Sequence, residues 1–274
     1  MQTEKPSTDA ALISWPEGAR AWGVGGWAIA TLPVILYYHD DFARLSDRLR
    51  QSVAALDLSS SDEDDSMAAL QVWGGCISLA LRGDRPSVGW LGQLSLELNL
   101  PQRSPHLAQQ LAQVQDWLAG RGPSAQPERS RSESAVGNHD PSRAIALALF
   151  APALYSVLST PDSVRLSLAQ AAALGDPSGN ASATVCALTG ALSGSVNSVR
   201  GIPLQWRQGL WADPTATSPV AERWGLPSEA ALLDLADRLA AHWSGLYDLE
   251  SPIEPRAIAL APDRIRPRPA RISV

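Results

Sequence analysis

Cysteine and positive charge are both scarce in this sequence of 274 residues. The two cysteines, Cys76 and Cys186, each lie in an apolar stretch, so neither a disulfide framework nor a zinc site is expected. There are 22 Lys and Arg residues against 28 Asp and Glu, which gives a net charge of −6. A chain of this charge creates no basic field, and we therefore expect no binding to nucleic acid.

Long stretches that are wholly apolar are also missing. The runs 21–38, 144–161 and 179–199 lack charge and reach the ~18 residues that span a bilayer, but glycine, proline or small polar residues interrupt each of them. We expect buried helices of a large bundle rather than membrane spans. The first ten residues are polar and do not resemble a secretory signal, so the expected protein is soluble and cytoplasmic.

The residues that are plentiful, alanine and leucine together with ten tryptophans, favour helices over strands. Apolar residues recur at spacings of three and four, and no segment shows the period of two that a half-buried strand requires. The sequence therefore predicts an all-α fold. The helices are expected at 22–38 with a break near Pro33, 42–56, 66–81, 88–98, 105–119, 142–158, 163–174, 180–196, 203–210 and 228–242. The inward residues of the second and third are expected to be Leu45, Leu49, Val53 and Leu56, and Leu70, Trp73, Ile77 and Leu81.

The distribution of polar and apolar residues predicts a single helical domain over 13–246, preceded by a tail at 1–12. A segment at about 120–141 has hardly any large apolar side chain and is expected to be a flexible insertion. The chain ends in a tail at 247–274, in which residues 251–274 hold five Arg, five Pro and two acids. We expect this tail to be basic and mobile, and able to bind an acidic protein partner.

The most informative motif is the run Gly175-Asp176-Pro177-Ser178-Gly179-Asn180, which precedes a helix of small residues. A carboxylate in a glycine-flanked loop at a helix start can offer oxygen ligands to a hard cation such as magnesium. The alternative is that Asp176 caps a turn and Asn180 caps the helix. On the residues alone, capping is the more common role for such a pattern.

Two further acidic groups invite a chemical interpretation. In the segment 62–66, Asp64, Asp65 and Ser66 could hold a metal, or the helix dipole could favour acids there without one. Taken alone, this segment is best interpreted as part of a solvated acidic loop over 59–65. The run His39-Asp40-Asp41 could act as a proton acceptor, but its place at a helix boundary favours an ordinary Asp cap.

From residue 144 onward the chain resembles the ADP-ribosylglycohydrolase family, most of all over 172–210. Members of that family carry a late Gly-Asp-x-Asp-Thr-like motif, then a helix rich in Ala and Gly, then an Ile-Pro-x-x-Trp segment. Gly175-Asp176, the segment 181–194 and the run Ile202-Pro203-Leu204-Gln205-Trp206 correspond to these in order. The family's early Thr-Asp-Asp-Thr motif has a counterpart in Glu63-Asp64-Asp65-Ser66.

The resemblance implies an orthogonal multi-helix bundle whose central cleft holds two magnesium ions. In the family those ions bind ADP-ribose and assist water in cleaving the N-glycosidic bond between ribose and an Arg or other acceptor. The metal residues that it implies here are Asp64, Asp65, Ser66 and Asp176. It also implies ADP-ribose or an ADP-ribosylated protein as the ligand.

The late motif departs from the family pattern, with Ser178 where the second Asp is expected and Gly179 where Thr is expected. Without one carboxylate, the remaining oxygens carry too little negative charge to hold two dications. We therefore expect an incomplete dinuclear magnesium site and a role in binding or regulation. The alternatives are an active magnesium-dependent hydrolase that uses the four metal residues, and a scaffold that docks through its basic tail.

Overall fold

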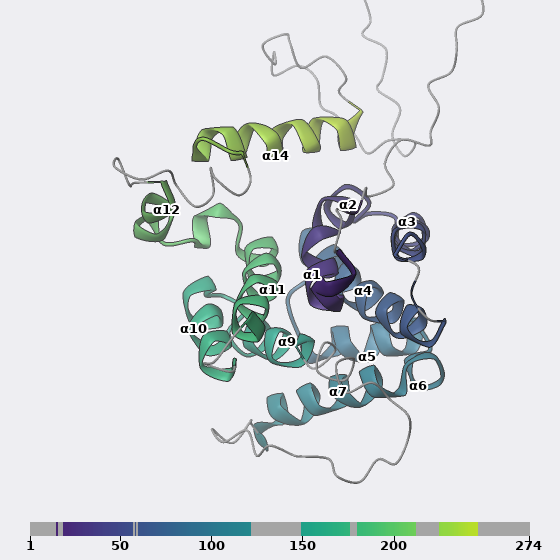
Figure 1. Ribbon diagram of the computed structural model, residues 1–274. Coiled ribbons are helices and arrows are strands. Elements are labelled where there is room, and N and C mark those ends of the chain that lie inside the picture. The colour runs from purple at the N-terminus through teal and green to yellow at the C-terminus, as the bar shows by residue number, and fades with distance from the viewer. Residues whose placement is uncertain are drawn as a thin grey trace, which may run out of the picture. The chain divides into compact units, whose positions relative to one another are not determined.

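The computed structural model describes residues 15, 19–56, 58, 60–121, 149–175, 180–211 and 225–245 (Figure 1). Every regular element in these ranges is a helix, so the predicted all-α fold is confirmed. The chain divides into two compact units, Met1–Ile202 and Pro203–Val274. The predicted single domain over 13–246 stays a prediction. Both tails, 1–12 and 247–274, and most of the insertion at 120–141 lie outside the described residues.

The first unit contains most of the helices. In chain order they are η1 (Ala19–Trp22), α1 (Gly23–Ala30), α2 (Leu32–Tyr37), α3 (Phe42–Ala54), α4 (Ser60–Leu81), α5 (Val88–Glu97), α6 (Leu100–Arg103), α7 (Pro105–Asp116), η2 (Trp117–Arg121), α9 (Phe150–Ser159), α10 (Val164–Leu174), α11 (Asn180–Asn197) and η3 (Val199–Gly201).

Helices α4 and α11 are the central elements of this unit. α4 packs against α1, α2, α3, α5, α6, α7 and α11, and each of its residues from 65 to 80 is buried. α11 packs against α1, α4, α9 and α10. A helix that is enclosed on all sides needs apolar or small residues around its whole circumference, and the sequence of α4 beyond its first turns has this character.

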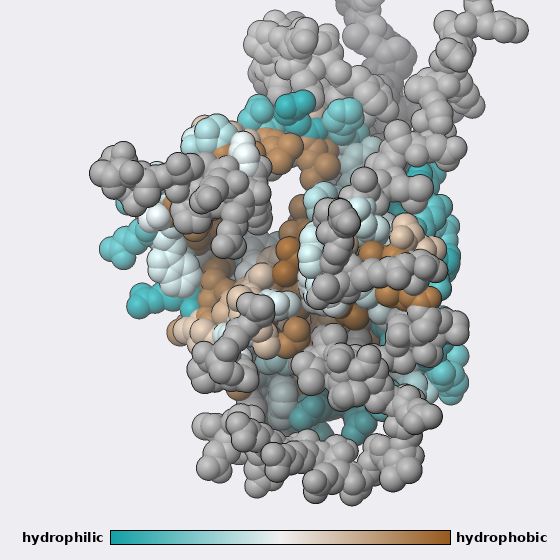
Figure 2. Space-filling model, in the orientation of Figure 1, coloured by the Kyte–Doolittle hydropathy of each residue, from teal (hydrophilic) through white to brown (hydrophobic). Residues whose placement is uncertain are grey.

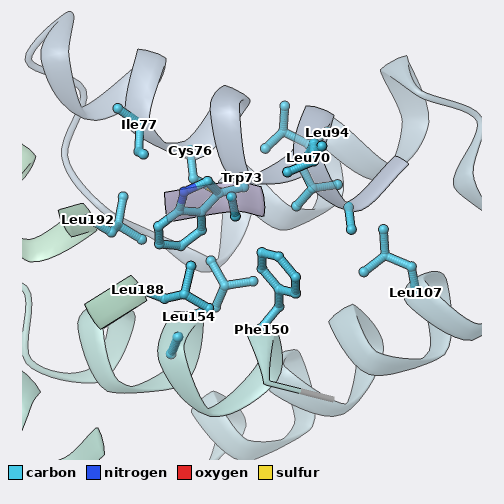
Figure 3. Packing of buried hydrophobic residues seen from close by; sticks show 14 of the residues in the cluster. Leu70, Trp73, Cys76, Ile77, Leu94, Leu107, Phe150, Leu154, Leu188 and Leu192 are labelled. Atoms are coloured by element: carbon cyan, nitrogen blue, oxygen red, sulfur yellow. The ribbon is translucent and has the colours of Figure 1, made fainter. Parts of the chain in front are cut away.

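Apolar side chains from both central helices meet in one core (Figure 3). Trp73 of α4 lies edge-to-face against Phe150 of α9, with ring centroids 5.9 Å apart. Leu188 and Leu192 of α11 lie on the side of Trp73 away from α5 and α7, and Leu154 lies beside Phe150. The aromatic pair therefore joins the helices before residue 121 to those after residue 149, and burial of its two rings excludes water from that boundary.

Several predicted helices begin and end as their sequences indicate. α3 begins after Asp41, whose carboxylate accepts a hydrogen bond from the Arg44 N–H at 3.1 Å. The four residues that were predicted to face inward are all buried: Leu45, Leu49, Val53 and Leu56. The predicted break near Pro33 is also confirmed, since α1 ends at Ala30 and α2 carries this proline in its first turn, where a missing N–H is tolerated.

Two expectations for this unit are wrong, the start of α4 and the inward position of Leu81, and one short helix was missed. α4 begins at Ser60 rather than at residue 66, so the predicted acidic loop over 59–65 lies almost wholly within its first turns. Acidic residues in the first turns of a helix lie near the positive end of its dipole, which stabilises helix in place of loop. Leu81 is 37% exposed because it lies in the last turn, past the enclosing helices. The short helix α6 was not predicted; Asn99 precedes it in the left-handed conformation, with φ of 51°.

Hydroxyl groups hold the turn between α9 and α10. The Oγ1 of Thr160 and the Oγ of Ser167 lie 2.9 Å apart, and the Ser167 hydroxyl donates to the Thr160 carbonyl. Asn197, at the end of α11, donates through Nδ2 to the carbonyl of Pro161 at 2.9 Å and to that of Ser193 at 3.0 Å. These buried and half-buried polar groups supply one another's hydrogen-bond partners. Their hydrogen bonds hold the turn between α9 and α10 against the end of α11.

The second unit contains α12 (Leu204–Trp211) and α14 (Glu229–Ser244). Ser228 caps α14, since its Oγ accepts a hydrogen bond from the Ala231 N–H at 3.2 Å, and Gly245 closes it in the left-handed conformation with φ of 80°. Arg207 of α12 forms an ion pair with Glu229 at the start of α14. In Figure 2, α14 shows a hydrophilic edge beside a hydrophobic strip. No helix among those described combines the length and apolarity needed to span a bilayer.

Candidate functional site

Helices α1, α4 and α11 pack against one another in all three pairs. The contact between α1 and α11 is close at Gly25, where an added Cβ would lie 2.6 Å from the Cγ2 atom of Thr184. A residue with a side chain fits at Gly25 only if the Thr184 side chain or one of the two helices moves. α4 carries the early motif from which a metal site is predicted, and α11 begins at Asn180, the last residue of the late motif.

The early motif does not present its two carboxylates in the same way. Asp65 and Ser66 are 5% and 4% exposed, whereas Asp64 is exposed to solvent. The boundary between exposed and enclosed helix falls between these two acids, since each residue of α4 from 65 to 80 is buried. Within this motif, only the Asp65 carboxylate and the Ser66 hydroxyl lie in the interior of the unit.

The late motif begins at a tight contact between helices. α10 ends at Leu174, and an added Cβ on Gly175 would lie 2.8 Å from the Cα atom of Ser182, in the first turns of α11. Because the neighbouring atom belongs to the backbone, only glycine allows this approach. Asp176, the fourth predicted metal residue, lies outside the described residues, and so do Pro177, Ser178 and Gly179. The metal and capping roles of this loop therefore stay predictions.

The residues that the structure describes do not by themselves fit two magnesium ions. Among them, no three His, Cys, Asp or Glu side chains come together as a group that could hold a metal. A magnesium ion takes about six oxygen ligands and usually needs one or two carboxylates. The interior part of the early motif offers one carboxylate and one hydroxyl, so any ion there would need further ligands from outside this motif.

The run His39-Asp40-Asp41 provides a helix cap, as its position at a helix boundary predicts. Asp41 caps α3, and the Nδ1 atom of His39 lies 2.7 Å from the carbonyl oxygen of Leu36. Arg82, just after α4, donates from Nη2 to the carbonyls of His39 and Asp40 at 3.1 and 3.2 Å. This turn joins α2 to α3 and binds the end of α4 through its carbonyls, so its observed contacts are structural.

The sequence did not single out an aromatic pair ahead of α1. Trp15 donates from Nε1 to the carbonyl of Ser52 at 2.7 Å, and its ring lies edge-to-face against that of Trp22, with centroids 6.3 Å apart. Trp22 is 46% exposed, whereas Trp27 and Trp73 are buried. Tryptophan is most often a core residue, and sequence spacing alone does not distinguish the exposed ring from the buried ones.

Comparison with known protein families gives one result. The sequence model of the ADP-ribosylglycohydrolase family matches residues 3–248. Comparisons with curated proteins and with solved structures give no match.

Proposed function

Because the chain belongs to the ADP-ribosylglycohydrolase family, we propose that it binds ADP-ribose or an ADP-ribosylated protein through an incomplete dinuclear magnesium site, in a binding or regulatory role. The observation that carries this proposal is the late motif, in which Asp176 is the one carboxylate between Gly175 and Asn180. Ser178 offers a neutral hydroxyl where the family pattern has a second acid, and Gly179 offers no side-chain ligand.

Charge decides how many ions such a site holds. Two Mg²⁺ ions bring four positive charges, and each ion demands a nearly octahedral set of oxygen atoms. Asp65 and Asp176 would supply two negative charges, and Asp64 is exposed to solvent. We infer that a pair of ions is bound too weakly to support the family's reaction, while ADP-ribose can still bind by hydrogen bonding and stacking.

The alternative is an active magnesium-dependent hydrolase that uses Asp64, Asp65, Ser66 and Asp176. Its support is that Asp65 and Ser66 are both buried in α4, which packs against α1 and α11, as expected of metal ligands shielded from water. Bound magnesium would supply positive charge that orients ADP-ribose and stabilises the developing charge. The protein's contribution would be to hold the ion and the ribose in place and to exclude bulk water.

Calorimetric titration with ADP-ribose, in magnesium and in EDTA, separates the two functions. The incomplete site predicts that Kd changes by less than about 2-fold between the two buffers, because no ion bridges ligand and protein. The active hydrolase predicts a Kd at least about 10-fold lower in magnesium, with this difference lost in Asp176→Asn. The control is Asp47→Asn, the same change at an exposed residue of α3.

Turnover of an ADP-ribosylated arginine peptide completes the test. Release of ADP-ribose that requires magnesium and is lost in Asp176→Asn would replace the proposed function with the alternative. No binding of ADP-ribose in either buffer would contradict both functions. Binding of an acidic protein partner by the basic tail at 247–274 stays a prediction. Unchanged capture of that partner after deletion of residues 251–274 would contradict this prediction.

A further inference from the structure

Three leucines of α14 are open to water within about one turn of that helix. Leu232, Leu233 and Leu235 are 36%, 43% and 51% exposed, and Ala241 is the one buried residue of α14. Large apolar side chains that lie together on a surface, with polar residues around them, mark a site of interaction. The charges beside each leucine indicate what kind of segment would cover it.

Leu233 and Leu235 lie beside charges of opposite sign. The surface neighbours of a helical residue are three and four positions away along the chain. Four positions before and after Leu233 are the acids Glu229 and Asp237. At the same spacings, the one charged neighbour of Leu235 is Arg238. Glu229 already has an ion-pair partner in α12, but Asp237 is exposed and forms no ion pair with any residue that the structure describes. The surface formed by Glu229, Leu233 and Asp237, the Leu233 face, therefore suits an apolar segment that carries positive charge.

The positive charge of the chain is concentrated near residue 274. Residues 251–274 hold five Arg and two acids, a net charge of +3 against −6 for the whole chain, which leaves −9 for residues 1–250. The arginine run, residues 264–271, contains four of these Arg, no acid and Ile265. The match to the family ends at residue 248, so this run is not part of the sequence that the chain shares with the family. The run combines the charge and the apolar side chain that the Leu233 face suits.

The arginine run is close enough along the chain to reach this face. α14 is about 24 Å long, at 1.5 Å for each of its 16 residues. The 18 residues between Gly245 and Arg264 can span at most about 60 Å, so the covalent connection allows contact with any part of α14. Both segments belong to the second unit, Pro203–Val274. A tethered segment meets its site at an effective concentration of roughly 1 mM, so that even a weak contact forms without a second molecule.

We propose that the arginine run binds the Leu233 face of α14 in the same chain. A guanidinium group of the run pairs with the Asp237 carboxylate, and Ile265 covers the exposed part of Leu233. Leu235 takes no part, because Arg238 repels a positive segment there. While bound to α14, the run is unavailable to an acidic protein partner, which must displace it first. The helix thereby regulates access to the tail.

The test is limited trypsin digestion of the full chain, followed by mass spectrometry. Trypsin cuts after Arg264, and a bound segment is cut more slowly than a free one. This cleavage should be roughly 5- to 30-fold slower in the full chain than in a synthetic peptide of residues 251–274. Leu233→Ser and Asp237→Asn should each remove part of this difference, and the double variant most of it. The control is Leu235→Ser, the same loss of an exposed leucine from the same helix, which should leave cleavage slow.

Four outcomes would overturn the inference. The first is cleavage after Arg264 at the same rate in the full chain and in the peptide. The second is slow cleavage that the double variant leaves unaltered, because the run would then bind elsewhere. The third is equal acceleration by Leu235→Ser, which would attribute release to loss of helix. The fourth is protection that appears only as the protein concentration is raised, which would place the run on a second copy. Because the digestion contains no ADP-ribose, each of these outcomes leaves the proposed function standing.

Discussion

Helices α4 and α14 differ in what surrounds them. In α4, every residue from 65 to 80 is buried among seven neighbouring helices, counting the short ones. In α14, all of whose residues are described, Ala241 alone is buried, and Leu232, Leu233 and Leu235 are exposed. The two helices are of comparable length, so their difference lies in tertiary contact rather than in helix size.

The comparison shows two ways in which one chain stabilises a helix. α4 is stabilised by burial of apolar surface, which contributes roughly 25 cal/mol for each Å² removed from water. α14 depends on local features: the Ser228 cap, Glu229 in its first turn, His242 in its last turn and Gly245 at its end. Local features are each worth about 1 kcal/mol or less, so α14 should unfold more easily.

The largest effect is expected from truncating a buried leucine of α4. Leu70→Ala should lower the free energy of unfolding of the first unit by about 2–5 kcal/mol, because it leaves a cavity in a fully enclosed position. Leu235→Ala, the matched change on exposed α14, should alter stability by at most about 0.5 kcal/mol. Chemical denaturation followed by tryptophan fluorescence measures both. Equal effects would contradict the difference between the helices.

A smaller effect is expected from adding a methyl group where helices meet closely. Gly25→Ala should destabilise the first unit by about 1–3 kcal/mol, because its Cβ would clash with Thr184 across the α1–α11 contact. Gly209→Ala in α12 has open space and should stabilise that helix by about 0.5–1 kcal/mol. Thermal unfolding of the two variants gives the sign of each change. A neutral Gly25→Ala would contradict this prediction, since it would show that the Thr184 side chain or the helices move aside without loss of stability.

Alkaline pH should act on α4 through its buried thiol. Burial raises the pKa of Cys76 from 9.0 to about 12. The unfolded chain loses this proton first, so the stabilisation is complete below pH 9 and is lost as pH rises toward 12. The free energy of unfolding should fall by about 1 kcal/mol between pH 9 and pH 10 from this group. Cys76→Ala should reduce the dependence of the unfolding free energy on pH above pH 9, and Cys186→Ala serves as the control. An unchanged pH dependence in Cys76→Ala would contradict the assignment of this effect to Cys76.

The smallest effect is expected at the cap of α14. Ser228→Ala removes the acceptor for the Ala231 N–H and should destabilise this helix by about 1 kcal/mol. Because α14 has little tertiary support, the loss should appear as faster amide hydrogen exchange along α14, while the amides of α4 stay protected. Faster exchange in α4 as well would show that the two helices unfold together.

Helix positions followed from the sequence where apolar periodicity was regular. α3 has polar residues between Leu45, Leu49 and Val53, and this pattern predicted both the helix and its inner face. The start of α4 was not predicted, because acids and serines are equally common in loops and in first turns. α6 was missed because four residues are too few to show a helical period.

The candidate site was predictable in chemistry but not in arrangement. The sequence identified Asp64 and Asp65 as a pair, but α4 becomes enclosed by its neighbours only from residue 65 onward, so only the second is buried. Gly175 belonged to a recognisable motif, but its close approach to Ser182 depends on how α10 and α11 pack. Exposure of Trp22 depends on tertiary contacts in the same way, and no local sequence pattern reports it.

Helix α10 is joined to α11 near both of its ends, which gives the pair mechanical stiffness. At one end Gly175 touches the backbone of Ser182, and at the other the Asn197 amide binds the carbonyl of Pro161. α11 measures about 27 Å along its axis, at 1.5 Å for each of its 18 residues. Because these contacts lie near opposite ends of the pair, sliding of α10 along α11 would disrupt the packing at Gly175 and the hydrogen bond at Pro161 together.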